Sequence, residues 1–436
     1  MEKNNKKVIN AWCMYDWANS VFSLTITTAI FPEYFLAVTP NNVDFLSFHL
    51  YNDVLMSYIV SASFLFAALL SPFLTSIADY SGRKKLFMQA FCYLGSLACL
   101  SLYFFKPESI NGEDVLTEQA LLIGVFGFFL GLVGYSGSIV FYNSFLPEVA
   151  DETNYDRVSA KGFSLGYIGS VLLLIINLAT VLGAEQLGIT TGEASRISFL
   201  TVGLWWLGFS QYTFRYLPKY SSASRGQGNW IFNGLKELKK VFHEVQKRRL
   251  LKIFLLSFFF YNMGVQTVMY LAPLFAKKEI ELESANLIMT ILIIQLVAIV
   301  GATFFNYTSS KLGNTRALLI GIAIWILVCA AAYFVQKGIG FYILAAMIGF
   351  VMGGIQSLSR STYSKLIPDE TTDHASYFSF YDVADKISTV LGTFMFGFVK
   401  QVTGSMRNSV LVIAVLFVIG GIILSYIPSK KVYSDK

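Results

Sequence analysis

The sequence predicts an all-α membrane protein in which twelve spanning helices form two pseudo-symmetric bundles of six. Three observations predict this fold class. Of the 436 residues, 55% are hydrophobic and only 14% are charged; long apolar stretches follow one another; and short motifs recur in both halves. Soluble domains carry roughly 25% charged residues, and a soluble chain of this length would have to bury almost all of its surface. A bilayer removes that requirement because lipid tails solvate apolar side chains directly.

Crossing about 30 Å of hydrocarbon takes about 20 mostly apolar residues. The first apolar stretch follows a basic start (Lys3, Lys6, Lys7) and is too long for the core of a signal peptide, so we expect it to be retained as a span. The predicted spans cover residues 8–36, 54–78, 86–105, 120–142, 161–183, 197–217, 251–276, 285–308, 317–336, 341–366, 377–400 and 408–428.

Positive residues predict the orientation. With both termini in the cytoplasm, the inner segments hold 25 of the 33 Lys and Arg residues and the outer segments hold seven, while Lys386 lies within a span. This bias follows the positive-inside rule and predicts a multi-pass protein of the cell (inner) membrane. The net charge of +6 is thereby explained by contact with anionic membrane lipids, and we do not expect binding to nucleic acid.

The longest polar segment divides the chain into an N-terminal bundle (1–217), a cytoplasmic linker (218–250) and a C-terminal bundle (251–436). The second part of the linker has the pattern of an amphipathic helix, which we expect to lie on the inner membrane surface; a site for a regulatory partner is the alternative. Its apolar face comprises Ile231, Leu235, Leu238, Phe242 and Val245, and its lysines Lys236, Lys239, Lys240 and Lys247 lie off that face.

The two halves share short motifs. Residues 142–148 (YNSFLPE) recur as residues 363–369 (YSKLIPD). Residues 79–85 (DYSGRKK) correspond less closely to residues 310–316 (SKLGNTR). In transporters built from parallel repeats, the substrate site lies between the halves near the middle of the membrane.

The segment 79–85 resembles the loop motif of the major facilitator superfamily, G-x-x-x-D-R-x-G-R/K-R/K. Asp79, Gly82, Arg83 and Lys84 match this motif, whereas Thr75 and Tyr80 depart from it. Three further stretches resemble the vacuole-effluxer-like branch, the bacterial relatives of the fungal autophagy-related amino-acid exporter. They are residues 12–20 (WCMYDWANS), 356–361 (QSLSRS) and 380–382 (FYD).

The resemblance implies the major facilitator fold and export of amino acids. It also implies that Asp79, Gly82 and Arg83 form a cytoplasmic gate, closed by contacts across the halves near the start of the eleventh span. Gly82 would supply a tight turn that a Cβ atom hinders. Arg360, near the inner end of the tenth span, is expected to pair with Glu148 or Asp382, or to reach the interface.

An ionisable residue within a span usually has a partner or a function. In the first span, Asp16, Ser20, Ser23 and Thr27 follow at spacings of 4, 3 and 4, which places them on one helix face. Tyr15 and Asn19 flank this polar track. The track predicts a cavity wall in which Asp16 binds a substrate ammonium group or a proton; alternatively, Asp16 caps a neighbouring helix.

The eleventh span carries a second polar face, comprising Asp382, Asp385, Lys386, Thr389 and Thr393. Lys386 can neutralise Asp382 one turn away, which leaves one carboxylate in excess. Either Asp385 or Asp16 is therefore a candidate proton carrier. The seventh span offers a further polar face of Tyr261, Asn262, Gln266 and Tyr270, which either contacts substrate or forms hydrogen bonds between helices.

These observations favour a secondary active transporter of small polar metabolites, amino acids first, that works by alternating access with proton coupling or as a uniporter. Efflux of drugs or other hydrophobic solutes is the second hypothesis, and a membrane receptor or scaffold on the same fold is the third. The sequence has no HExxH motif and no phosphate-binding loop, so we expect no enzyme activity. Cys and His are scattered, so we expect no cofactor and no metal. The expected partners are a small-molecule substrate, protons and lipids, and a monomer is favoured.

Overall fold

The computed structural model describes residues 3–45, 48–110, 113–218, 230–282, 284–336 and 338–428, and it confirms the predicted fold class. The helices of the first half are α1 (Lys6–Val21), α2 (Phe31–Val38), α3 (Asn52–Ser81), α4 (Lys84–Ser101), α5 (Glu118–Ser144), α6 (Leu146–Val149), α7 (Tyr155–Leu182) and α8 (Thr191–Tyr216). After α9 (Trp230–Lys247) follow α10 (Arg249–Glu279), α11 (Ser284–Leu312), α12 (Asn314–Phe334), α13 (Gly338–Leu366), α14 (His374–Thr403) and α15 (Met406–Ser425).

All twelve predicted spans coincide with long helical segments. The first segment is interrupted by a π-helix, η1 (Phe22–Ile30), between α1 and α2. Within the described residues, ten of the segments are long and apolar enough to cross a membrane. The other two are α8 and α14. In α14 the charged residues Asp382, Asp385 and Lys386 lower the apolar content, and α8 is rich in Trp, Ser and Thr.

Short elements outside the spans were not predicted. Strands β1 (Asn42–Phe45) and β2 (Phe48–Tyr51) form an antiparallel hairpin between the first two spans. Strands β3 (Glu108–Ile110) and β4 (Glu113–Val115) form another before α5. Two 3-10 turns, η2 (Leu102–Phe104) and η3 (Glu152–Asn154), complete the described elements. Both hairpins lie in loops between helices and leave the helical architecture unchanged.

Local side-chain chemistry sets several helix ends. Thr117 and Thr190 accept hydrogen bonds from backbone N–H groups in the first turns of α5 and α8, as N-cap residues do. Gly82 and Gly404 end α3 and α14 in the left-handed conformation, with φ of 69° at both positions. Glycine adopts this conformation without the steric cost that a Cβ atom brings.

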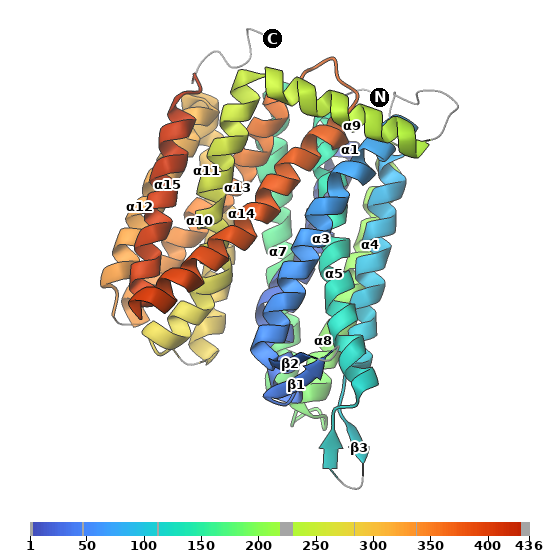
Figure 1. The fold of residues 1–436 in the computed structure, drawn as a ribbon, viewed down its shortest axis with the longest axis vertical. Coiled ribbons are helices and arrows are strands. Elements are labelled where there is room, and N and C mark those ends of the chain that lie inside the picture. The colour runs from blue at the N-terminus through green and yellow to red at the C-terminus, as the bar shows by residue number, and fades with distance from the viewer. Residues whose placement is uncertain are drawn as a thin grey trace.

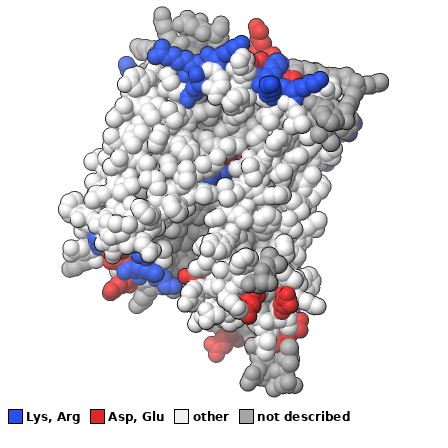
Figure 2. All heavy atoms as spheres, in the orientation of Figure 1, with Lys and Arg blue, Asp and Glu red and all other residues white. Residues whose placement is uncertain are grey.

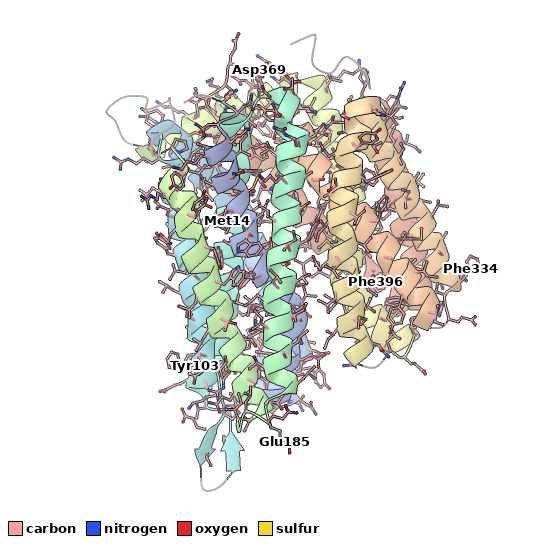
Figure 3. All side chains as sticks on the ribbon, turned by 180° about the vertical axis from the view of Figure 1, so that it is seen from behind. Met14, Tyr103, Glu185, Phe334, Asp369 and Phe396 are labelled. Atoms are coloured by element: carbon pink, nitrogen blue, oxygen red, sulfur yellow. The ribbon has the colours of Figure 1, made fainter. Side chains whose placement is uncertain are left out.

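The two halves lie together at one end of the molecule and diverge at the other (Figure 1). Across the halves, α3 and α5 contact α14, while α7 contacts α11 and α13. Helix α9 crosses the closed end. Seen from behind, Asp369 lies at this end, whereas Tyr103 and Glu185 lie at the far end of the N-terminal half (Figure 3).

Charge is distributed unevenly along the molecule. Lys and Arg side chains gather at the α9 end, and a broad zone follows that is white except for one small blue and red patch near its centre (Figure 2). The beginning of α1 and the end of α15 lie at the α9 end as well. This end is therefore the one that the positive-inside rule predicts to be cytoplasmic.

Helix α9 packs on protein and does not present its whole apolar face to lipid. Val241 and Val245 are buried, whereas Leu235 and Phe242 are 40% and 51% exposed. The helix reaches both halves: Asn233 Nδ2 donates to Tyr80 Oη of α3 (2.8 Å), and Tyr377 Oη of α14 donates to Glu244 Oε2 (2.8 Å). The predicted face is thus divided because one edge of the helix covers the ends of α3 and α14. The side chain of Ile231 lies outside the described residues.

Candidate functional site

A cavity of about 160 Å³ lies between the two halves, beside the π-helical part of the first span. The wall from the N-terminal half is mostly polar, and the wall from the C-terminal half is mostly apolar. No Asp, Glu, Lys or Arg occurs among the described residues that line it. The N-terminal wall is formed by Ser20, Ser23, Leu24, Thr28, Tyr135, Phe163, Tyr167 and Ser170. The C-terminal wall includes Val268, Met269, Ala272, Pro273, Leu287, Thr290, Ile291, Ile294, Gln295, Ile348, Met352 and Gln356.

The π-helix shifts the predicted polar track. Ser20 and Ser23 line the cavity as expected, but Thr28 lines it in place of Thr27. A π-helix bonds i to i+5 and turns more slowly than an α-helix, so extrapolation at 3.6 residues per turn fails beyond Ser23. Within the same turn, Thr28 Oγ1 donates to the carbonyl oxygen of Ser23 (3.0 Å). π-helical segments are frequent at functional sites.

The cavity is closed toward the α9 end by contacts between the halves. Tyr167 Oη of α7 donates to Gln356 Oε1 of α13 (2.8 Å), and both side chains line the cavity. Nearer to α9, Ser159 Oγ donates to the carbonyl oxygen of Ser357 (2.7 Å). These two bonds join α7 to α13 directly and form the floor of the cavity.

Behind this floor, Arg360 of α13 reaches into the N-terminal half. Its guanidinium lies 3.2 Å from Asp16 Oδ2, donates to Ser159 through Nε and Nη2 (2.9 Å each), and donates to Asn143 Oδ1 (3.3 Å). Arg360 is 3% exposed and Asp16 is 8% exposed. A buried pair of this kind loses about 3–5 kcal/mol when one partner is removed, because the other charge stays uncompensated.

Three aromatic rings surround the same guanidinium. Its Cζ atom lies 4.2 Å from the ring centroid of Phe163, 4.8 Å from that of Trp12 and 5.3 Å from that of Tyr142. Tyr142 Oη also donates to Asp16 Oδ2 (2.7 Å). Because these distances are within the range of cation–π attraction, Arg360 occupies an aromatic and acidic pocket.

A second group of cross-half contacts lies nearer to α9. Asp156 of α7 accepts hydrogen bonds from Lys365 Nζ (2.8 Å), Asn314 Nδ2 (2.8 Å) and Ser309 Oγ (3.0 Å). These three partners belong to α13, α12 and α11, so one carboxylate holds three helices of the other half. Lys365 also donates to Asn314 Oδ1 (2.9 Å).

The predicted cytoplasmic gate makes the third contact. Asp79 at the end of α3 has no exposed surface and accepts hydrogen bonds from the backbone N–H of Ser376 (2.6 Å), Ser376 Oγ (2.8 Å) and the N–H of Ala375 (3.3 Å). A carboxylate at a helix N-terminus is favourable because unpaired N–H groups and the helix dipole meet it there. Asp79 thus joins α3 to the start of α14.

The turn that follows Asp79 orders the rest of the gate loop. Gly82 adopts φ of 69°, and the N–H of Arg83 donates to the carbonyl oxygen of Ala78 (3.0 Å). Lys84 is 1% exposed, contacts Glu148, and lies 3.8 Å from Asp79. Glu148 therefore pairs with Lys84. The sequence-based alternative in which Glu148 pairs with Arg360 is wrong.

In α14, Lys386 pairs with Asp382 one helical turn away, as predicted from the spacing. Asp385 accepts hydrogen bonds from Asn262 Nδ2 (2.8 Å) and Gln266 Nε2 (2.9 Å) of α10. In the described part of the chain, no Lys or Arg nitrogen is placed within 4 Å of Asp385. Of the two candidate proton carriers, Asp16 is thus paired with a cation, and Asp385 is held by amides.

Several predicted residues lie away from the cavity. Tyr15 is fully buried between Tyr142 and Phe214, inside the N-terminal half. Adjacent residues of a helix point about 100° apart, so Tyr15 does not share the face of Asp16. Asn19 is buried as well and does not line the cavity.

The polar face of the seventh span points mainly at other helices. Asn262 and Gln266 bind Asp385, and Tyr261 Oη shares a hydrogen bond with Ser359 Oγ (2.7 Å). Tyr270 does not line the cavity either. The alternative of hydrogen bonds between helices therefore holds for the first three residues.

Sequence reasoning missed the α7 side of the site. Gly162, Gly166 and Gly169 allow α1 to approach closely: a Cβ atom at Gly162 would lie 2.4 Å from Asp16 Oδ2, and one at Gly166 would lie 2.5 Å from Ser20 Oγ. The spacing of 4 and 3 residues between these glycines was the signal that could have identified this helix face.

The opposite end is held more weakly. There Lys277 Nζ lies 3.6 Å from Glu33 Oε1, and these side chains are 53% and 72% exposed. Exposed ion pairs contribute about 0–1 kcal/mol. The contacts that close the molecule therefore concentrate at the α9 end.

The sequence model of a protein family, described as "Vacuole effluxer Atg22 like", matches residues 4–436. The chain belongs to this family. It is 32% identical to the uncharacterized MFS-type transporter YxiO of Bacillus subtilis over 434 residues, which is 99% of this chain and 97% of the relative. It is 27% identical to autophagy-related protein 22 of Kluyveromyces lactis over 374 residues, covering 80% and 74% of the two chains.

Solved structures show the same fold. The transporter FucP in the outward conformation superposes with a TM-score of 0.71 at 13% identity, covering 97% of this chain and 98% of FucP. The proton:xylose symporter XylE gives a TM-score of 0.73 at 14% identity, covering 98% and 96%. This Atg22-like protein is thus a multi-pass membrane protein and a secondary transporter of the major facilitator superfamily, not an enzyme. The resemblance inferred from its motifs is confirmed.

Proposed function

We propose that this Atg22-like protein carries a small metabolite with one polar and one apolar side, amino acids first, across the cell (inner) membrane. Both termini lie in the cytoplasm, and residues 1–217 and 251–436 move as two units by alternating access. The observation that carries the proposal is a two-faced cavity between the halves, sealed toward α9 by cross-half contacts. The chain in this arrangement faces outward.

The size and lining of the cavity support this class of substrate. A volume of about 160 Å³ suits a small metabolite. Hydroxyl groups on the N-terminal wall can bind a polar end by hydrogen bonds. The C-terminal wall of Val, Ile and Met side chains suits an apolar side chain.

The second hypothesis, efflux of hydrophobic drugs, is supported less well. Pockets for drug-sized ligands are about 300–1,000 Å³, larger than this cavity. The third hypothesis, a receptor or scaffold, does not account for three successive polar contacts between the halves, which suit surfaces that must separate and meet again.

Asp385 supplies the coupling step in this proposal. It accepts hydrogen bonds from two amide groups, and no Lys or Arg nitrogen among the described residues is placed within 4 Å of it, so it can take up a proton without breaking an ion pair. Asp16 is engaged by Arg360 and serves the gate. A carboxylate in a membrane span commonly serves proton transfer.

Transport in proteoliposomes tests the proposal. Purified protein is assayed for uptake and efflux of a panel of amino acids and sugars, with and without a pH gradient. We expect a neutral apolar amino acid to be moved, and Asp385→Asn to abolish accumulation driven by the gradient while exchange at equal pH persists. Asp53→Asn, at an exposed position in the first turn of α3, is the matched control. Intact gradient-driven accumulation in Asp385→Asn would refute the proton-carrier assignment.

A further inference from the structure

The pocket around Arg360 is built as a receptor for an organic cation. Its carboxylate comes from Asp16, and its neutral acceptors are Asn143 Oδ1 and the Ser159 hydroxyl and carbonyl oxygens. Three rings, those of Trp12, Tyr142 and Phe163, lie around the guanidinium. Aromatic rings combined with an anion form a recurring binding site for ammonium and guanidinium groups. We call these six residues the cation cage.

The absence of a side chain at Gly162 leaves space for the bound cation in the cage. A Cβ atom at Gly162 would lie 2.4 Å from Asp16 Oδ2, 3.0 Å from Arg360 Nη2 and 3.1 Å from Tyr142 Oη. Any side chain at this position would therefore intrude between the carboxylate and the bound cation. Gly162 belongs to α7, like Ser159 and Phe163.

The cation cage and the Arg360 side chain that occupies it belong to different halves. All six cage residues lie on α1, α5 and α7, whereas Arg360 lies on α13. When the halves separate at the α9 end, Arg360 must leave with the C-terminal half, and the cage stays intact in the N-terminal half. A cation site then opens on the cytoplasmic side.

This arrangement is not a repeated feature of the fold. The motif at residues 142–148 recurs at residues 363–369, so the counterpart of Arg360, three positions before Tyr363, is Ile139, three positions before Tyr142. The repeat therefore places a cation in only one half. The charge serves this one contact and is not required by the packing of the bundles.

We propose that the cage binds the ammonium or guanidinium group of a solute when the protein faces the cytoplasm, and that Arg360 occupies the same site when it faces outward. This inference rests on the proposed alternating access. Arg360 acts as a tethered competitor: it expels the cationic group as the inner gate closes, and a bound cation delays closure. The solute is then one that carries an organic cation, which narrows the substrate class beyond a small two-faced metabolite.

Binding to a cage that Arg360 has vacated tests the proposal. The Arg360→Ala variant of the full chain is purified in detergent and titrated with millimolar guanidinium chloride, and Tm is compared with titration by sodium chloride at the same ionic strength. We expect a saturable rise of about 2–4 °C, since a ligand that binds only the folded state stabilises it. Wild-type protein should show no such rise.

Two controls establish that the cage is responsible. Arg360→Ala combined with Asp16→Asn removes the carboxylate and should abolish the rise. Arg407→Ala removes another partly buried arginine, which pairs with Glu279 and lies 5.9 Å from the Phe275 ring centroid, and should not create the response. A rise in either control, or no rise in Arg360→Ala, would overturn the proposal. If Arg360→Ala does not fold, Arg360→Gln takes its place with the same criteria.

Failure of this inference is distinguishable from failure of the proposed function. The titration measures equilibrium binding in detergent and needs no transport. If amino acids are transported in proteoliposomes but guanidinium does not bind, the proposed transport function stands and the cation cage has no role in substrate recognition. Binding without flux of any solute in the panel would retain the cation site and contradict the substrate class.

Discussion

The Asp79→Asn substitution should open the cytoplasmic gate. The Asp79 carboxylate is fully buried and accepts hydrogen bonds from two backbone N–H groups and one hydroxyl at the start of α14. An Asn side chain has nearly the same shape but carries no charge. Its amide group also turns one of the two acceptor atoms into a donor, which would face the N–H groups of Ala375 and Ser376.

The magnitude follows from these contacts. A hydrogen bond to a charged group contributes about 1.5–3 kcal/mol. The one side-chain oxygen that remains in the Asp79→Asn variant can still accept a hydrogen bond from α14, so only part of this stabilisation is lost. We expect the closed arrangement to lose about 2–3 kcal/mol, which shifts the ratio of closed to open molecules about 30- to 150-fold. A population of closed molecules that dominates in the wild type would then share the ensemble with open ones.

Distances between spin labels measure this shift. Labels at Arg157→Cys and Lys311→Cys, two exposed positions on α7 and α11 near the α9 end, report separation of the halves. The four native cysteines are buried and free, so they should label poorly. We expect Asp79→Asn to add a population at longer distance in nanodiscs, and Asp53→Asn, at the other end of α3, to leave the distribution unchanged. Identical distributions for Asp79→Asn and wild type would refute the gate argument.

Three further predictions concern packing, pairing and turn geometry. Gly162→Ala should lower stability by about 1–3 kcal/mol because its Cβ atom meets Asp16, and the Tm of Gly208→Ala, where nothing lies within 4 Å, should not change. Lys386→Met leaves the buried Asp382 carboxylate unpaired and should cost about 3–5 kcal/mol in detergent unfolding. The double variant with Asp382→Asn should recover most of this, and a single variant as stable as wild type would contradict the pairing. Gly82→Val forces φ of 69° on a β-branched residue and should slow turnover in proteoliposomes without reducing membrane insertion; unchanged turnover would remove the turn from the gate.

The spans were predictable because their cause is local. Each crossing needs an apolar stretch of fixed length, so the spans can be read from consecutive residues. The i,i+4 pair of Asp382 and Lys386 was predictable for the same reason. The register of the first span was predictable only as far as Ser23, because the π-helix that begins at Phe22 moves Thr28 into the cavity wall in place of Thr27.

Contacts between the halves were not predictable in this way. Arg360 and Asp16 are 344 residues apart, and the alternatives predicted for Arg360 were Glu148, Asp382 or the membrane interface. Which acid meets Arg360 depends on the crossing of α1, α7 and α13, and that crossing depends on the glycines of α7. Only the contact of Asp79 with the start of α14 was expected beforehand, and it came from the family motif and not from residue spacing.

Charge pairing also determines when the halves can separate. At the α9 end, Arg360 pairs with Asp16 and Lys365 pairs with Asp156, and all four residues are buried. Opening the gate parts both pairs and leaves charges to be solvated, which is unfavourable unless water or a new partner replaces each one. A solute cation in the cage would replace Arg360 at Asp16, so opening is favoured when cargo is present. In the proposed mechanism, the Arg360–Asp16 pair that seals the empty carrier would therefore couple its opening to the solute.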